Sequence, residues 1–534
     1  MVSRLLPSLL VVAGCVTQPA PLDMCVEVAD EPAKARRPPP SGLMYEVYVR
    51  SWQDSDGDGI GDLAGVVEHL DHLEAIGVRT LWLMPVFPSP SRAGYDPVAL
   101  DSVRPDYGDE ADLLALFDAA AARGIDVILD APVNHVSDQH PWFQAVVEDP
   151  DALEADAFLV SDRQWDELRW YPLAEDRWYY AYFGEEMPDL DWTSPLVADS
   201  VPADLGQWLD QGAGGYRFDA VRQLVEDDGA IADTEVGHCT LAWLYARLGG
   251  RRGLVFSEAW SEDLDEVLPY LGTEDRPEAD LLLGMPRRRA IADAFQQADR
   301  APLVVELLAE ADAGVLERMA TPLGSHDLPR LADMVPEAAL RRAWMVLQLT
   351  LPGVPVLYYG DEIDLYSTDV DQQQDQPWRA PMPWTADAWG GFSTSTPWMA
   401  LADGYAEGFN VADQWQDPWS MLSLVGALAR LREAVDALDH GALIVHDTHD
   451  RAVLAFERRA DDADDAVMVL VNLGDRAIDE VAVPTLERVA WFDLTDGGVE
   501  RDLGTGAVGL PPLGYRVLSA APLPDLAVPG PVPR

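Results

Sequence analysis

Short apolar runs alternate with helical stretches along most of this chain, and this alternation constrains the fold more than any other feature. Stretches such as 63–76 and 111–123 carry apolar residues at helical spacing. The runs between them have the composition of buried strands and cover 44–49, 80–84, 127–129, 215–219, 254–257, 280–284, 319–324 and 354–359. Strands that alternate with helices pair in parallel, so eight such units predict an α/β fold, a (β/α)₈ TIM barrel.

Three regions depart from this alternation after the third strand. Residues from about 136 to 212 are dense in Trp, Tyr and Asp and too long for a loop, so they predict a subdomain inserted over the barrel mouth. The barrel region would run from 41 to 430. Short strands with turn signals then predict a C-terminal antiparallel β-sandwich over 431–520. The Pro-rich end, 521–534, predicts an unstructured tail.

The first 40 residues have the features of an export signal and a flexible tether. Arg4 precedes an apolar run that is too short to span a membrane. The stretch ending at Cys15, "VAGC", resembles the lipobox of bacterial lipoproteins, whose cysteine is lipidated. We therefore expect an exported lipoprotein at the cell surface or periplasmic face, or alternatively a secreted protein. Cys25 and Cys239 could pair, or Cys239 could be a buried apolar residue, and the sequence leaves this open.

The formal net charge of −56 limits the partners of the protein. Nucleic acid and anionic membrane surfaces would repel such a chain, so we expect neither as a partner, and membrane contact only through a lipid on Cys15. With 48% hydrophobic residues the composition is that of a folded globular protein, which we expect to be a monomer.

Polar residues follow four of the predicted strands, at the end where TIM barrels carry their chemistry. They are Asp130 and Asn134-His135 after the third strand, Arg217 and Asp219 at the fourth, Glu258 after the fifth, and His326-Asp327 after the seventh. Arg217 and Asp219 are two residues apart on a strand and so share one face. Burying such charges is costly unless they are paired or used. The pattern predicts that three carboxylates converge on one barrel mouth.

The motifs that carry these residues resemble the α-amylase family of glycoside hydrolases (family 13), from about Tyr45 into the C-terminal domain. They are "DAPVNH" (130–135), "GYRFDA" (215–220), "SEAW" (257–260), "SHD" (325–327), "MPDLDW" (187–192) and "LPGVPVLYYGDE" (351–362). Two further motifs, "GYDP" (94–97) and "RAPMPW" (379–384), resemble the oligosaccharide-acting branch between α-glucosidases and α-amylases.

The resemblance implies a role for each charged residue. Asp219 would be the nucleophile, Glu258 the general acid and then the base, and Asp327 the third carboxylate, which binds sugar hydroxyls. Arg217 would hold the pKa of Asp219 down and keep it ionised. Glu258 must hold a proton near neutral pH, so we expect a drier site for it, closer to other negative charge.

The resemblance also implies a set of substrate-binding residues. His135 and His326 would bond hydroxyls of the sugar in the cleavage subsite, and Tyr95 offers a stacking face. Asp96 and Arg379 would hold the non-reducing end of that sugar, and an ion pair between them would close the pocket.

These residues predict a retaining hydrolase that cleaves α-1,4-glucosidic bonds in malto-oligosaccharides or starch-derived glucans. Arg222 and Gln223 replace the Lys-His pair of many amylases, which leaves endo or exo cleavage open, with amylase-type cleavage favoured. The alternatives are an exo-acting α-glucosidase and a transglycosidase such as a trehalose synthase. A non-catalytic sugar-binding relative is disfavoured because all three carboxylates are present.

The stretch "DSDGDGIGD" (54–62) has the spacing of a calcium loop. Ligands at positions one, three, five, seven and nine would be Asp54, Asp56, Asp58, the Ile60 carbonyl and Asp62. Position twelve is Gly65, so the bidentate Glu of a full EF-hand is missing. The alternative is an Asp/Gly-rich turn without an ion. The resemblance favours a structural Ca²⁺, with Mg²⁺ as a second option.

Overall fold

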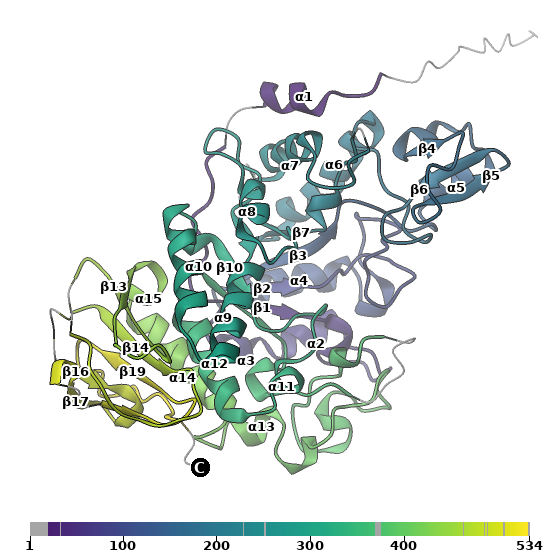
Figure 1. The fold of residues 1–534 in the computed structure, drawn as a ribbon. Helices are drawn as coiled ribbons and strands as arrows, with labels where there is room; N and C mark the ends of the chain where they lie inside the picture. The colour runs from purple at the N-terminus through teal and green to yellow at the C-terminus, as the bar shows by residue number, and fades with distance from the viewer. Residues whose placement is uncertain are drawn as a thin grey trace, which may run out of the picture.

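The computed structural model describes residues 20–531 apart from 32–33, 228, 250–252, 369–374, 463, 485, 487, 489 and 506–507. Its centre is a closed parallel barrel, which confirms the predicted α/β fold (Figure 1). The barrel strands are β1 (Leu43–Val47), β2 (Val78–Leu83), β3 (Asp126–Pro132), β7 (Gly215–Asp219), β8 (Leu254–Ser257), β9 (Leu281–Leu283), β10 (Met319–Pro322) and β11 (Val354–Tyr358). They lie in the order β1-β11-β10-β9-β8-β7-β3-β2, each beside its neighbour in the chain.

Helices surround the barrel and cover the outer face of its strands (Figure 1). They are α2 (Leu63–Glu68), α3 (Leu70–Ala75), α4 (Glu110–Ala121), α6 (Pro195–Gln211), α7 (Glu235–Leu248), α8 (Leu264–Val267), α9 (Met285–Gln297), α10 (Ala301–Asp312), α11 (Leu331–Met334) and α12 (Ala338–Thr350). The predicted stretch 63–76 is therefore two short helices that meet at His69. Inside the barrel, apolar side chains including Met44, Trp82 and Phe256 form a separate buried cluster.

The register of two neighbouring strands places charged residues side by side. In the pairing of β3 with β7, Asp130 lies opposite Arg217 and Pro132 opposite Asp219. A side chain cannot be accommodated at position 215, where β7 begins, because a Cβ atom there would lie 2.1 Å from the Leu254 carbonyl oxygen. Gly215 thus lets β8 pair closely with β7, so that Glu258 follows directly beside the end of β7.

A subdomain is inserted after β3, as predicted, and it contains a small antiparallel sheet. It contains α5 (Pro141–Glu148) and the strands β4 (Val160–Ser161), β5 (Trp170–Ala174) and β6 (Arg177–Tyr180), in the order β4-β6-β5. The chain then returns to the barrel through α6, where the Leu205 carbonyl accepts a hydrogen bond from the Tyr216 hydroxyl of β7. The insertion projects to one side of the barrel (Figure 1).

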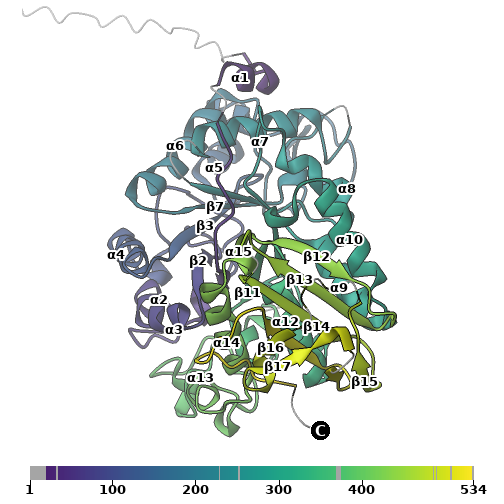
Figure 2. The ribbon, with the colours of Figure 1, turned by 90° about the vertical axis from the view of Figure 1, so that its left-hand side faces the viewer.

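The C-terminal part of the chain is an antiparallel sheet domain, also as predicted. Three helices lead into it: α13 (Val411–Gln414), α14 (Met421–Ala434) and α15 (Ala437–His440). Its strands are β12 (Ala442–His446), β13 (Val453–Arg459), β14 (Ala466–Asn472), β15 (Ile478–Val481), β16 (Ala490–Asp493), β17 (Val499–Asp502), β18 (Val508–Leu510) and β19 (Tyr515–Ser519). Six form one sheet, in the order β12-β13-β14-β19-β16-β17, and β15 pairs with β18. The domain packs beside the barrel (Figure 2).

The described part of the Pro-rich end, 521–531, differs from the unstructured tail that its composition predicts. The hydroxyl of Tyr515 donates to the Pro529 carbonyl at 2.7 Å, and the Val528 amide donates to the Leu494 carbonyl at 3.1 Å. The Val528 side chain is buried. These contacts hold the segment against the C-terminal domain.

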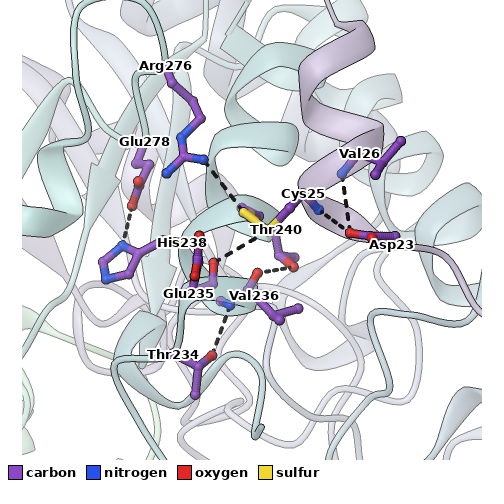
Figure 3. The surroundings of a disulfide bond; sticks show 12 residues. Asp23, Cys25, Val26, Thr234, Glu235, Val236, His238, Thr240, Arg276 and Glu278 are labelled. Carbon is purple, nitrogen blue, oxygen red and sulfur yellow. Dashed lines mark hydrogen bonds and ion pairs between the residues drawn. A yellow bond between two sulfur atoms is a disulfide. The ribbon is translucent and has the colours of Figure 1, made fainter.

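The described part of the N-terminal segment likewise is not the flexible tether that was expected. Helix α1 (Met24–Asp30) begins at Asp23, whose carboxylate caps it, and packs against α7. Cys25 of α1 and Cys239 of α7 form a disulfide, with their Cα atoms 4.9 Å apart (Figure 3). Farther on, the Arg36 guanidinium donates to the Leu271 and Gly272 carbonyls at 2.9 and 2.7 Å.

The predicted export signal and Cys15 lie outside the described residues. Among the helices of the described chain, none combines the length and the apolar character that a membrane span requires.

Candidate active site

The guanidinium of Arg217 is the centre of a cluster of carboxylates at the C-terminal end of the barrel strands. Its Nη1 atom lies 2.7 Å from Asp130 Oδ1 and 2.7 Å from Asp219 Oδ1, and its Nη2 atom lies 2.7 Å from Glu258 Oε2. Arg217 is almost wholly buried. One cation therefore binds carboxylates from β3, β7 and the turn after β8, which brings the proposed nucleophile and the proposed acid side by side.

The surroundings of Glu258 raise the pKa of its carboxyl group. Its Oε2 atom binds Arg217 and accepts the backbone N–H of Ala220 at 3.1 Å. Ala220 adopts the left-handed conformation, with φ 50°, directly after β7. Burial raises the pKa of Glu258 to about 7, and the charges of Asp219 and Asp327 add to the rise while Arg217 opposes it. Both donors bind Oε2, so Oε1 is the atom that would carry the proton.

The pKa of Asp219 differs in direction from the expectation. Burial raises it above the usual value for an aspartate, and Arg217 opposes this rise without reversing it. The negative charges of Asp130 and Asp327 raise it further by repulsion. Arg217 also shares its own charge with Asp130. Arg217 thus limits the cost of ionising Asp219 but does not bring the pKa below its usual range.

Asp327 and His326 form a second charged group at the same mouth. His326 Nε2 lies 3.0 Å from Asp327 Oδ2, and its Nδ1 binds Glu46 of β1. Burial alone would lower the pKa of His326, but Asp327 and Glu46 raise it to about 10, so the ring is an imidazolium. Although burial acts in the opposite direction, His326 and Arg217 hold the pKa of Asp327 well below its usual range. Asp327 is therefore ionised, and its side chain is 44% exposed.

Tyr95 and His135 line the same site and are fixed by several hydrogen bonds. The Tyr95 hydroxyl donates to Asp130 Oδ2 at 2.9 Å and accepts from His326 Nε2 at 2.7 Å, and its ring stacks on that imidazolium. His135 Nε2 donates to the Tyr95 carbonyl at 2.7 Å. Burial lowers the pKa of His135 to about 4, so this ring is neutral.

Asp96 and Arg379 do not form the ion pair that was expected to close the pocket. Arg379 binds Asp375 at 3.0 Å and donates to the His326 carbonyl at 3.1 Å. Its guanidinium also lies 3.7 Å from Asp327. The carboxylate of Asp96 instead accepts the hydroxyl protons of Ser89 and Ser91. Each side chain therefore has polar partners of its own.

A pocket of about 450 Å³ opens above these groups. Its walls include the three carboxylates together with Tyr95 and His135. The remaining lining residues are Tyr182, Phe183, Met187, Ala220, Gln223 and Trp260. Aromatic side chains from the insertion and from the turn after β8 thus form the rim, which suits a ligand with both apolar and hydrogen-bonding faces.

Sequence reasoning did not find Glu46 and Trp82. Glu46 lies within β1 and binds His326, whereas the Trp82 indole N–H of β2 donates to Asp130 at 3.1 Å. A charged residue inside an otherwise apolar strand was the signal that could have identified Glu46.

The Asp54–Asp62 loop lies apart from this pocket, and its donor set fits a hard cation. Carboxylate oxygens of Asp54, Asp56 and Asp58 lie within 4.8 Å of one another. Burial and the neighbouring carboxylates raise the pKa of Asp58, as expected of crowded negative charge. Asp62 has other partners, since it caps α2 through the Gly65 N–H at 2.7 Å and accepts the Ser55 N–H at 2.8 Å. The Ile60 N–H donates to Asp58, and its carbonyl stays a predicted ligand.

Comparisons with known proteins agree with this geometry. The family model "Alpha amylase, catalytic domain" matches residues 46–441. Alpha-amylase 3 of Dictyoglomus thermophilum is 29% identical over 81% of this chain and 85% of its own length. The trehalose synthase of Pimelobacter sp. (strain R48) is 30% identical over 81% of this chain and 86% of its own length.

A solved structure shares the fold. The trehalulose synthase MutB of Pseudomonas mesoacidophila MX-45 superposes with a TM-score of 0.78 over 90% of this chain and 98% of its own, at 24% identity. The family match, which covers most of the chain, and the carboxylates at the strand ends lead to one conclusion: the chain belongs to the α-amylase family of glycoside hydrolases.

Proposed function

We propose that this enzyme is a retaining hydrolase that cleaves α-1,4-glucosidic bonds in malto-oligosaccharides and starch-derived glucans. The observation that carries the proposal is the pair of carboxyl groups that share Arg217 at the end of the barrel strands, with the third carboxylate, Asp327, in the same pocket. Burial raises the pKa of Glu258 to about 7, so this group can hold a proton at neutral pH and act as the acid. Burial raises the pKa of Asp219 as well, but the Arg217 guanidinium lies 2.7 Å from its carboxylate and favours the ionised form that a nucleophile needs.

In the first step Asp219 attacks the anomeric carbon while Glu258 donates its proton to the leaving glycosidic oxygen. A bond forms between the Asp219 carboxylate and the sugar as the glycosidic bond breaks. In the second step Glu258, now a carboxylate, takes a proton from water, whose oxygen attacks the same carbon and releases Asp219. Two inversions give net retention, for which we expect carboxyl groups about 5–5.5 Å apart.

The charged residues around this pair have supporting roles in the proposal. Asp327 stays ionised beside His326 and would stabilise positive charge that develops on the sugar ring. Tyr95 would contact the apolar face of that sugar. His135 and His326 would bond its hydroxyls, and Asp96 and Arg379 would bind its non-reducing end. Asp96 and Arg379 do not pair with each other, and such a pair would have closed the pocket beyond one sugar, so its absence supports amylase-type cleavage in this proposal.

A time course on maltoheptaose tests the proposal. Hydrolysis should release shorter malto-oligosaccharides in the α-configuration, as seen by NMR of the freshly formed anomers. Cleavage of a maltoheptaose nitrophenyl glycoside blocked at its non-reducing end would show internal action, and cleavage of only the unblocked sugar would show exo action. Release of β-anomers would contradict retention.

Sugar transfer is the second candidate activity, because a trehalose synthase and an α-amylase match the chain at nearly equal identity. In that case a sugar hydroxyl, and not water, would attack the glycosyl-enzyme. Incubation with maltose alone separates the two: glucose as the product indicates hydrolysis, and trehalose or longer sugars indicate transfer.

We further propose that Asp54, Asp56 and Asp58 bind a structural Ca²⁺, or Mg²⁺ in its place, with the Ile60 carbonyl and Asp62 as further ligands. The oxygen donors and the tight turn at Gly59, whose φ is 95°, support this. We also propose that the protein is exported, through either a lipid anchor on Cys15 or secretion. The disulfide of Cys25 and Cys239 supports export, because such bonds persist in oxidising compartments.

A further inference from the structure

A second cavity, of about 750 Å³, lies between the catalytic region and the C-terminal domain. Three segments line it: the turn between α13 and α14 together with one face of α14, the 3₁₀ turn η12 (Leu494–Asp496), and the backbone of 527–530. It is larger than the catalytic pocket and shares no lining residue with it. None of its lining residues is acidic, although the whole chain has 93 Asp and Glu.

Two tryptophans give this cavity its chemical character. Trp415 is 37% exposed and Trp419 is 50% exposed, so both indoles offer apolar surface to the cavity that they line. Trp415 is held rigidly, because its ring packs against α14 at Gly426 and meets the ring of His72 edge-on. Within the described chain, neither indole N–H has a hydrogen-bond acceptor, so each can donate to a ligand.

Arg430 adds a free cation beside the indole ring of Trp415. A Cβ atom at Gly426 would lie 3.1 Å from that ring and 3.4 Å from Arg430 Nη1, so the guanidinium and the indole are neighbours. Arg430 is exposed and has neither an ion pair nor a hydrogen bond among the residues that the structure describes. Among the described residues, the guanidinium N–H groups of Arg430 therefore have no acceptor and are available to a ligand in the cavity.

The part of the wall formed by residues 527–530 is also fixed. The Pro529 carbonyl accepts from the Tyr515 hydroxyl and the Gly530 carbonyl from Arg342, while the Val528 amide donates to Leu494. A preformed cavity of this kind binds a ligand without first having to order its walls.

We infer that this cavity is a second binding site for α-glucan chains, separate from the catalytic pocket. Aromatic faces suit the apolar faces of sugar rings, and unpaired indole and guanidinium donors suit their hydroxyl oxygens. An anionic ligand would be repelled by a chain of net charge −56, whereas a neutral ligand would not. A metal ion or a cationic ligand would need carboxylates, and none of the lining residues has one. The inference rests on the proposed function, because the ligand is the glucan that the enzyme would cleave.

The test is the binding stoichiometry of maltoheptaose, measured by isothermal titration calorimetry on the full chain with Glu258→Gln to prevent cleavage. Two molecules should bind per chain. Adding Trp419→Ala should remove one binding event or weaken it about tenfold, the factor that a loss of about 1.4 kcal/mol gives. Arg430→Gln should weaken the same event. Trp389→Ala is the matched control, since Trp389 is 40% exposed and lines neither cavity, and it should leave both events unchanged.

Activity on two substrates gives an independent readout. In the otherwise native enzyme, Trp419→Ala should slow degradation of starch granules but leave kcat/KM on maltotriose unchanged, because the short sugar needs only the catalytic pocket. A single binding event in the Glu258→Gln chain, or two events insensitive to Trp419→Ala and Arg430→Gln, would overturn the inference. A concentration-dependent dimer that Trp419→Ala abolishes would show that a second copy of the chain covers the cavity, and would overturn it as well.

Failure of the proposed function gives a different result. In that case the wild-type enzyme would not cleave maltoheptaose at all, whatever residue stands at position 419. Normal cleavage together with unchanged binding in the Trp419 variant would overturn only the second site.

Discussion

Replacing Arg217 with Lys tests whether one guanidinium organises the carboxylates that we propose to be catalytic. Arg217 places two nitrogens at 2.7 Å from three carboxylates, whereas an ammonium group is a single atom on a flexible stem and cannot reproduce that fork. The variant should lose at least one charge-assisted hydrogen bond, worth about 1.5–3 kcal/mol. If that loss falls on the transition state, kcat/KM should drop about 10- to 150-fold.

The same substitution should also move the pH profile. Arg217 lowers the pKa of both Asp219 and Glu258, so weakening its contacts should raise both values. The proposed mechanism needs Asp219 ionised and Glu258 protonated, and both limbs of the profile should therefore move to higher pH. A purely structural defect would lower activity without moving the limbs.

The assay is the pH dependence of kcat/KM on maltotriose, with thermal melting followed by circular dichroism to confirm folding. Arg123→Lys is a suitable control, because Arg123 pairs with the exposed Asp71 on the outer surface. Near wild-type kcat/KM in folded Arg217→Lys, with both limbs unmoved, would refute the reasoning.

Four further predictions concern single features. Asp219→Asn should reduce kcat on maltotriose by about 10⁴-fold or more without lowering Tm, since a nucleophile is lost and not core packing; turnover near the normal rate would contradict the assignment. The kcat/KM of the wild-type enzyme should fall as pH rises through about 7, where Glu258 of the free enzyme loses its proton, and Glu258→Gln should still cleave α-maltosyl fluoride, whose leaving group needs no acid; a flat alkaline limb would argue against Glu258 as the acid. Chelation with EDTA should lower Tm, because an ion bound only to the native state stabilises it, whereas Asp56→Asn should make Tm insensitive to EDTA; an equal Tm with and without EDTA in the wild type would exclude the ion. Replacing Cys25 and Cys239 together with Ser should lower the free energy of unfolding in urea by about 2–5 kcal/mol and leave kcat unchanged, and an unaltered midpoint would contradict the disulfide.

The barrel could be predicted from sequence because each strand and helix has its own local pattern. All eight strands lie where the apolar runs place them, and the carboxylates at their ends gather around Arg217. Glu46 was missed because its partner, His326, is 280 residues away, and only closure of the barrel brings β1 beside β11. The pKa of Asp219 was missed for a related reason. The number of carboxylates that share one cation depends on strand register and not on local sequence.

Composition was a poor guide at both ends of the chain. Pro-rich segments lack the periodicity that identifies helices and strands, and they were therefore interpreted as flexible. Single long-range contacts hold them instead, such as Arg36 to the Leu271 carbonyl and Tyr515 to the Pro529 carbonyl. Contacts of this kind have no periodic signature, so the sequence could not indicate them.

The disulfide also determines how the molecule would bear mechanical tension. If the chain is pulled at its N-terminus against its C-terminus, the covalent path runs from Cys25 directly to Cys239, across a sequence separation of 214 residues. Residues 26–238 then form a closed loop that carries no tension, and this loop contains β1, β2, β3 and β7. Half of the barrel, including Arg217 and Asp219, is thereby shielded from stretching. If the chain is attached to a surface by its first residues, as proposed above, a bound polymer could pull on it without stretching β7, the strand that carries Asp219.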